Sequence, residues 1–216
     1  MSGTKLTHFI FIVLSVVFLS GCEKKASDEI DFGTVEGSVY RNEYFGLSIS
    51  FPSGWSIQDQ ETQKELMDIG TKLAAGDDEN LEAVIKASEL QSVNLVAAFE
   101  HPLGAPVASN PSLMCIAEKV RHVPGIKRGS DYHFHFRKLL ESSAIDVSFP
   151  RETSTEKIGG VDFDVMYIEA LTAGVIIQQK QYAAISKGYA LLLTITYTTD
   201  EEKASLQKLL ESVTFK

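Results

Sequence analysis

Residues 188–198 read GYALLLTITYT, and this stretch decides the fold class. Large apolar side chains occupy every second position, and a mixed set lies between them: Tyr189, Leu191, Leu193, Ile195 and Tyr197 alternate with Ala190, Leu192, Thr194 and Thr196. Side chains of a β-strand point alternately to the two faces of its sheet. The stretch therefore predicts a strand with one apolar face and one mixed face.

A helix is predicted directly after this strand. Thr199, followed three residues later by Glu202, is typical of a capping box at the start of a helix. Apolar residues then recur at helical spacing, at Leu206, Leu209, Leu210 and Val213. The chain therefore ends on a helix that buries one apolar stripe.

The preceding residues predict a series of antiparallel strands. STEKIGG (154–160), VDFDVMYIEAL (161–171) and GVIIQQKQYAAIS (174–186) are separated by glycines that favour turns. Near the start, VYRN (39–42) and FGLSISF (45–51) predict a hairpin.

Helices and further strands are predicted in blocks between these two groups. Helical spacing recurs in 61–76, with Leu66, Ile69 and Leu73 on one face, and in 80–88, with Leu81, Val84 and Ile85. Residues 131–143 predict a third helix, and 93–100, 112–120 and 145–149 predict strands. Because the predicted strands and helices occur in blocks and do not strictly alternate, the sequence favours an α+β domain, with helices packed on the faces of a central antiparallel sheet.

The N-terminus predicts export. FIFIVLSVVFL (9–19) is apolar, uncharged and of signal-peptide length, shorter than the roughly 20 residues of a membrane-spanning helix. Leu19-Ser20-Gly21-Cys22 resembles a bacterial lipobox, in which cleavage precedes a cysteine that carries acyl chains such as palmitate. The resemblance implies that Cys22 anchors a lipoprotein, since two or three acyl chains hold a protein firmly to a membrane. The alternative is a free cysteine behind an uncleaved leader.

We expect a signal peptide in 1–21, a flexible tether in 22–34 and a single domain in 35–216. The predicted location is the cell envelope, and Glu23 favours an outer membrane facing the periplasm if the source is Gram-negative. With 20 Lys and Arg against 29 Asp and Glu, the chain disfavours nucleic acid as a partner and anionic lipid as a docking surface.

Candidates for chemistry are few in the sequence. Cys115 lies in an apolar strand and is expected to be a buried hydrophobe rather than a reactive thiol. His133 and His135 could chelate a metal from a strand, but a predicted helix separates them by about 200°, which favours solvent-facing or cap-proximal histidines. Asp162 and Asp164 could form an acidic pair, but we expect them to be ordinary polar residues on the open face of an antiparallel sheet. Nucleophile, zinc-protease and nucleotide-binding motifs are absent, so we expect no enzyme, metal or cofactor.

Several stretches resemble the PsbP-like fold, the group that includes the periplasmic DcrB proteins and a Ran-binding nuclear import factor. They are YFGLSISFPSGWSI (44–57), NPSLMCIAEKV (110–120), DYHFHFRKLLES (131–142), IGGVDFDVMYIEA (158–170) and residues 182–215. The resemblance implies an α/β/α sandwich around a central antiparallel sheet, and members that mostly act as assembly factors or binding modules. Fold alone does not fix function.

Three functions stay open from the sequence. The first is a lipid-anchored, non-catalytic binding or assembly module for an unnamed envelope protein. The others are a carrier of an apolar envelope ligand and an enzyme with a dispersed site. For the first, the loop HPLGAPVASNPS (101–112) is the candidate partner-binding surface, because long irregular loops often carry function and Leu103, Pro106 and Val107 offer apolar contacts.

Overall fold

The computed structural model of the chain describes residues 30–172 and 174–216. The first described residue, Ile30, packs against the core, and Asp31 accepts hydrogen bonds of 2.9 Å from the side chain of Asn42. Ile30 and Asp31, in the segment predicted as a tether, are therefore in contact with the folded domain. The predicted signal peptide, Cys22 and the first part of that tether lie outside the described residues.

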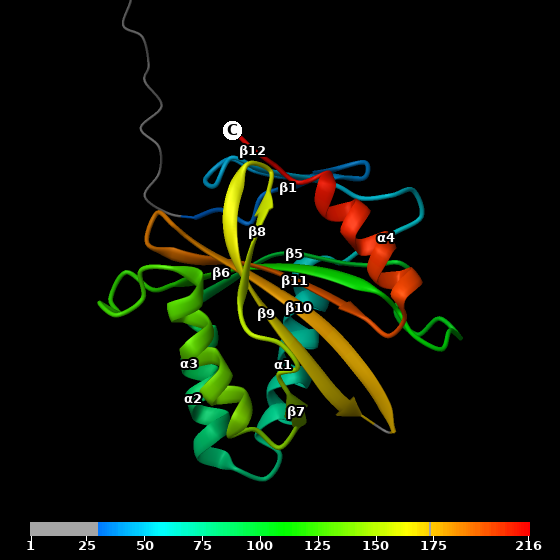
Figure 1. The fold of residues 1–216 in the computed structure, drawn as a ribbon. Coiled ribbons are helices and arrows are strands. Elements are labelled where there is room, and N and C mark those ends of the chain that lie inside the picture. The colour runs from blue at the N-terminus through cyan, green and yellow to red at the C-terminus, as the bar shows by residue number, and fades with distance from the viewer. Residues whose placement is uncertain (1–29, 173) are drawn as a thin grey trace, which may run out of the picture.

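An eight-stranded antiparallel sheet forms the centre of the described chain (Figure 1). Its order is β4-β5-β6-β11-β10-β9-β7, and β8 pairs with β9 beside β7. The strands are β4 (Ser56–Ile57), β5 (Ser92–Phe99), β6 (Ser112–Lys119), β7 (Asp146–Ser148), β8 (Ser154–Ile158), β9 (Val161–Thr172), β10 (Val175–Ser186) and β11 (Tyr189–Tyr197).

One face of this sheet is covered by the helix α4 (Asp200–Glu211) and a small second sheet (Figure 1). The small sheet runs in the order β1-β2-β3-β12, with strands β1 (Thr34–Glu36), β2 (Val39–Asn42), β3 (Leu47–Ser50) and β12 (Thr214–Phe215). The larger core cluster lies between these elements and the central sheet, and includes Tyr40, Ile49, Cys115, Leu193 and Leu206.

The opposite face carries α1 (Gln60–Ala75), α2 (Glu79–Glu89) and α3 (Gly129–Glu141) (Figure 1). Glu118 of β6 ties two of them to the sheet, because its carboxylate accepts hydrogen bonds from Ser88 of α2 at 2.8 Å and Tyr132 of α3 at 2.7 Å. The start of α3 lies so close to β10 that a Cβ at Gly129 would be 2.0 Å from the carbonyl oxygen of Ala183. Only glycine fits there.

The α+β class predicted from the sequence is confirmed, with helices on both faces of a central antiparallel sheet. The predicted capping box of Thr199 and Glu202 is also present at the start of α4. The apolar stripe predicted for α1 is not its buried face: Ile69 and Leu73 are exposed.

Polar and small side chains instead form the buried row of α1. Gln63 donates to the backbone oxygen of Gln58 at 3.0 Å, and Thr71 donates to Glu89 of α2. These hydrogen bonds make burial of the polar side chains acceptable, and small residues allow close packing.

A partly buried ion pair joins β8 to β10 within the central sheet. Lys180 of β10, whose side chain is 5% exposed, lies 2.8 Å from a carboxylate oxygen of Glu156 on β8, which is 35% exposed. Tyr182 and Tyr167 also donate to Glu156, each at 3.2 Å. The carboxylate therefore links three strands.

We predict that Glu156→Gln lowers the free energy of unfolding by about 1–3 kcal/mol, because it leaves the ammonium group of Lys180 buried without a counter-charge. Urea denaturation at neutral pH measures this. Asp162→Asn is the matched control, since it breaks the exposed pair with Lys157 on the same hairpin and should cost less than about 1 kcal/mol. Equal effects of the two substitutions would contradict the structural role of Glu156.

His133 of α3 is buried under the helix, with 2% of its surface exposed. Neither ring nitrogen has a hydrogen-bond partner in the described chain. Burial lowers the pKa of His133 to about 4, although the nearby charge of Asp164 acts in the opposite direction. The helical assignment was right, whereas the expected exposure holds for His135 alone.

We predict that stability falls as the pH is lowered from about 6.5 to about 4. In this window the unfolded chain binds a proton at His133 that the folded chain does not, so unfolding becomes easier. The loss is at most roughly 3 kcal/mol. Urea denaturation across this range should show a shallower pH dependence for His133→Phe, whereas the exposed control His135→Phe should follow the wild type. An unchanged slope for His133→Phe would contradict the prediction.

Candidate binding surface

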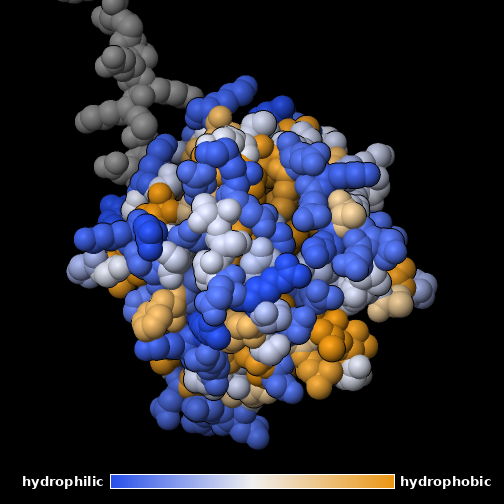
Figure 2. All heavy atoms as spheres, in the orientation of Figure 1, coloured by the Kyte–Doolittle hydropathy of each residue, from blue (hydrophilic) through white to orange (hydrophobic). Residues whose placement is uncertain are grey.

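The β9–β10 hairpin projects beyond the helices at one end of the molecule (Figure 1). Its free end, defined here as Glu169–Thr172 and Val175–Gln178, carries apolar side chains that face solvent. Leu171, Val175 and Ile176 are 49%, 51% and 54% exposed. Figure 2 shows hydrophobic atoms gathered toward this end of the molecule within a mostly hydrophilic surface. Contiguous exposed apolar surface of this kind marks interaction sites.

The strand register arranges the side chains on the α4 side of the sheet in rows. Alternate residues share a face, so the paired residues of neighbouring strands form rows across it. The two outer rows are Asp146, Leu171 and Ile176, followed by Ser148, Glu169, Gln178 and Tyr197. The two inner rows are Tyr167, Lys180 and Ile195, followed by Val165, Tyr182, Leu193 and Cys115. The innermost of these rows is core, the middle rows are polar, and the outermost is apolar again. Only the outermost row combines apolar residues with exposure.

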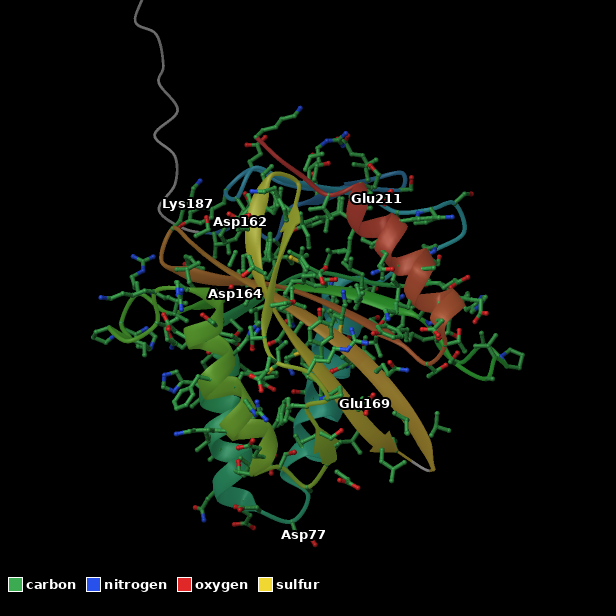
Figure 3. All side chains as sticks on the ribbon, in the orientation of Figure 1. Asp77, Asp162, Asp164, Glu169, Lys187 and Glu211 are labelled. Atoms are coloured by element: carbon green, nitrogen blue, oxygen red, sulfur yellow. The ribbon has the colours of Figure 1, made fainter. Side chains whose placement is uncertain are left out.

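A pocket of about 150 Å³ lies between β7 and the free hairpin end. Leu171 and Ile176 supply its apolar wall, and Asp146 and Glu169 place carboxylates at it. We call it the β7 pocket. Figure 3 shows Glu169 on the projecting part of the hairpin.

A second pocket, of about 210 Å³, joins the hairpin to the loop between β5 and β6. Val175 and Ile177 line it from the hairpin, whereas Ala108 and Pro111 line it from the loop. The loop predicted as the partner-binding segment and the free hairpin end therefore form one surface.

Backbone and side-chain hydrogen bonds close the loop at its base. His101 and Asn110 exchange two bonds of 2.9 Å, and Ser109 donates to Glu202 of α4. The predicted contact residues Leu103, Pro106 and Val107 are exposed beyond this closure. The loop thus presents them from a fixed base, as a binding loop requires.

A third pocket, of about 120 Å³, adjoins the β7 pocket across Glu169. Arg151 and Lys203 bring positive charge to it, and their cationic groups lie 5.3 Å and 5.9 Å from the ring centres of Tyr167 and Tyr197. The surface therefore changes from acidic and apolar at the hairpin end to basic and aromatic near α4.

The titratable cluster around Lys180 is not suited to proton transfer. Burial alone would raise the pKa of Glu156, but the hydrogen bond and charge of Lys180 outweigh burial and lower it. Burial and the adjacent Glu156 carboxylate raise the pKa of Tyr182. Both shifts lead away from neutrality, whereas general acids and bases work best with a pKa near the ambient pH.

The other candidate residues lie apart from this surface. Cys115 is fully buried at the centre of the sheet, and burial raises the pKa of its thiol. Asp162 pairs with Lys157 at 2.7 Å, whereas Asp164 accepts from the backbone of Ser130 at 2.6 Å. Within residues 30–172 and 174–216, no group of three or more His, Cys, Asp or Glu could hold a metal ion.

Sequence reasoning missed the free hairpin end. VII at 175–177 follows Gly174 and reads as the start of an ordinary buried strand. The length of the two flanking strands was the available signal, since strands usually run to about five or six residues.

No protein-family model and no curated protein sequence matches the chain. Similar solved structures exist. Cyanobacterial PsbP (CyanoP) from Synechocystis sp. PCC 6803 is 11% identical with a TM-score of 0.49, over 85% of this chain and 96% of that chain. PsbP belongs to the group that the sequence resembles.

Two further solved structures are similar. LpqN of Mycobacterium tuberculosis, described as involved in cell envelope biogenesis, is 12% identical with a TM-score of 0.42, over 78% of this chain and 82% of that one. The protein PA94 of Pseudomonas aeruginosa is 13% identical with a TM-score of 0.40, over 81% and 93%. At such identities and TM-scores these similarities say nothing of what this chain binds.

Proposed function

We propose that the chain is a lipoprotein of the bacterial cell envelope, anchored through acyl chains on Cys22, that acts as a non-catalytic binding or assembly module for another envelope protein. The observation that carries the binding role is the joint surface of the loop and the free hairpin end. It exposes aliphatic side chains on two strands that are paired residue by residue from Thr172 and Val175 inward. Preorganised apolar contacts of this kind favour protein association, since little conformational entropy is lost on binding.

The proposal of a lipid anchor is supported by the sequence of the leader and by the cysteine that follows it. In the described residues no helix is long and apolar enough to cross a membrane. Acyl chains on Cys22 would hold the domain at the membrane without such a helix.

A carrier of an apolar ligand is supported less well. The three pockets described above have volumes of about 120–210 Å³, whereas pockets for small molecules usually enclose roughly 300–1,000 Å³. An enzyme with a dispersed site is also supported less well, because the pKa shifts of Glu156 and Tyr182 lead away from neutrality.

We predict that Cys22→Ala releases the protein from membranes or leaves it as an unprocessed precursor. Cell fractionation and mass spectrometry of the mature N-terminus measure this. Cys115→Ala is the matched control, because it removes the other cysteine of the chain and should leave anchoring unchanged. An unmodified Cys22 behind an intact leader would refute the anchor.

The binding role is tested at the loop. We predict that a triple variant, Leu103→Ser, Pro106→Ser and Val107→Ser, loses most of the envelope protein that cross-links to the wild type, while the base of the loop stays closed by His101 and Asn110. Cross-linking, purification in detergent and mass spectrometry identify and quantify the partner. Val84→Ser with Leu90→Ser is the control, since it removes exposed apolar side chains at and beyond α2. Full recovery of the partner by the loop variant would exclude the loop from the binding surface.

A further inference from the structure

The β7 pocket combines two features that together select a ligand. Its wall is aliphatic, and carboxylates stand in two adjacent rows of the sheet: Asp146 opposite Leu171, and Glu169 opposite Ser148. Rows on one face are separated by about 7 Å, which is two residues along a strand. A single extended side chain can therefore lie on the apolar wall and reach both carboxylates.

Neither carboxylate is neutralised within the described chain. Asp146 and Glu169 form no ion pair with a described residue, and the one side-chain hydrogen bond of Glu169 is a long one of 3.5 Å from Ser148. By contrast, Glu156 in the polar row nearer the core is paired with Lys180 at 2.8 Å. The negative charge at the free hairpin end is available to a partner.

We propose that the β7 pocket receives a lysine or arginine side chain from a protein partner. Such a side chain has an aliphatic stem, which would pack on Leu171 and Ile176, and a cationic head, which would lie between Asp146 and Glu169. Aliphatic residues next to that basic residue would contact the apolar end of the hairpin, where Val175 faces the opposite side from Ile176. This inference rests on the proposed binding function and names the chemistry of its partner.

The negative charge of the chain disfavours a second copy of the chain and anionic lipid as occupants of this surface. A second copy would bring a molecule of net charge −9 against an equally charged one and would add like charges at the carboxylates. Anionic lipid would be repelled for the same reason. A partner with basic residues gains from both the apolar and the charged parts of the pocket.

The position of the predicted anchor leaves this surface free to face away from its own bilayer. The described chain begins at the end of the molecule opposite the free hairpin end (Figure 1). Eight residue steps separate Cys22 from Ile30, which reach at most about 28 Å. β10, with 12 residues, spans about 40 Å from its Lys187 end to its free end. The pocket can therefore meet a partner held farther from that membrane than the start of the domain is.

The test places a photo-crosslinking amino acid, p-benzoylphenylalanine, at Gln178 in the full chain within native envelopes. Gln178 lies opposite Glu169, on the same face of the sheet as Leu171 and Ile176, and does not line the β7 pocket. We expect an adduct with one protein, whose cross-linked segment carries Lys or Arg beside aliphatic residues. Asp146→Asn with Glu169→Gln should lower the adduct yield roughly tenfold.

Asp77→Asn with Glu211→Gln is the matched control. It changes the net charge equally, but Figure 3 shows both residues away from the free hairpin end, which Glu169 marks, so the yield should stay at the wild-type level. A synthetic peptide of the cross-linked segment should bind the purified full chain in detergent, and its Lys→Glu or Arg→Glu variant should not.

Several results would overturn the inference: an adduct with a second copy or with lipid, an adduct whose yield is unchanged by Asp146→Asn with Glu169→Gln, or no adduct at Gln178. The same probe at Val107 and Val84 separates this failure from that of the proposed function. Protein adducts at either of those positions, with none at Gln178, would leave a binding module that uses another surface. No adduct at any of the three would overturn both.

Discussion

The mismatch in length between the strands and the helices governs this structure. β9 and β10 have 12 residues each and span about 40 Å, whereas α3 and α4, with 13 and 12 residues, span about 20 Å. The helices therefore cover only part of the hairpin. The core gathers under the covered part, and the rest projects into solvent (Figure 1).

The side chains along the hairpin follow from this mismatch. Tyr182 and Leu193, under α4 and the small sheet, are fully buried. One row farther out, Lys180 is still buried but needs the carboxylate of Glu156, since an unpaired charge there would be costly. Beyond it, Glu169 and Gln178 meet solvent and need no pairing. The core therefore does not require aliphatic residues at the free hairpin end. For this reason we assign these aliphatic side chains to binding.

Much of the architecture could be predicted from the sequence. The alternation in 188–198 and the capping box at Thr199 determine β11 and α4 through local rules, and both are present. The buried row of α1 could not be predicted, because Gln63 and Thr71 are buried only where the segment after β4 and the helix α2 supply hydrogen-bond partners. Strands of two or three residues, such as β4 and β12, carry too little pattern to be recognised.

The same distinction applies to the candidate site. The loop with Leu103 and Val107 was found from its length and composition, which are local properties. The free hairpin end was not, because exposure of Val175 depends on how far the helices reach. The β7 pocket depends on the pairing of Asp146 with Leu171, residues 25 positions apart in the chain, which only the register defines.

An exposed aliphatic hairpin end carries a risk that its carboxylates reduce. Apolar side chains on projecting strands favour self-association as readily as a specific contact. Asp146 and Glu169 change this balance, because they would face like charges in a second copy of an acidic chain but opposite charges in a basic partner. Specificity is a difference between affinities. A carboxylate that strengthens binding of a basic partner and weakens self-association increases this difference from both sides. Paired internally, as Glu156 is, the same groups would lose this effect, which gives a physical reason for leaving them without an ion pair among the described residues.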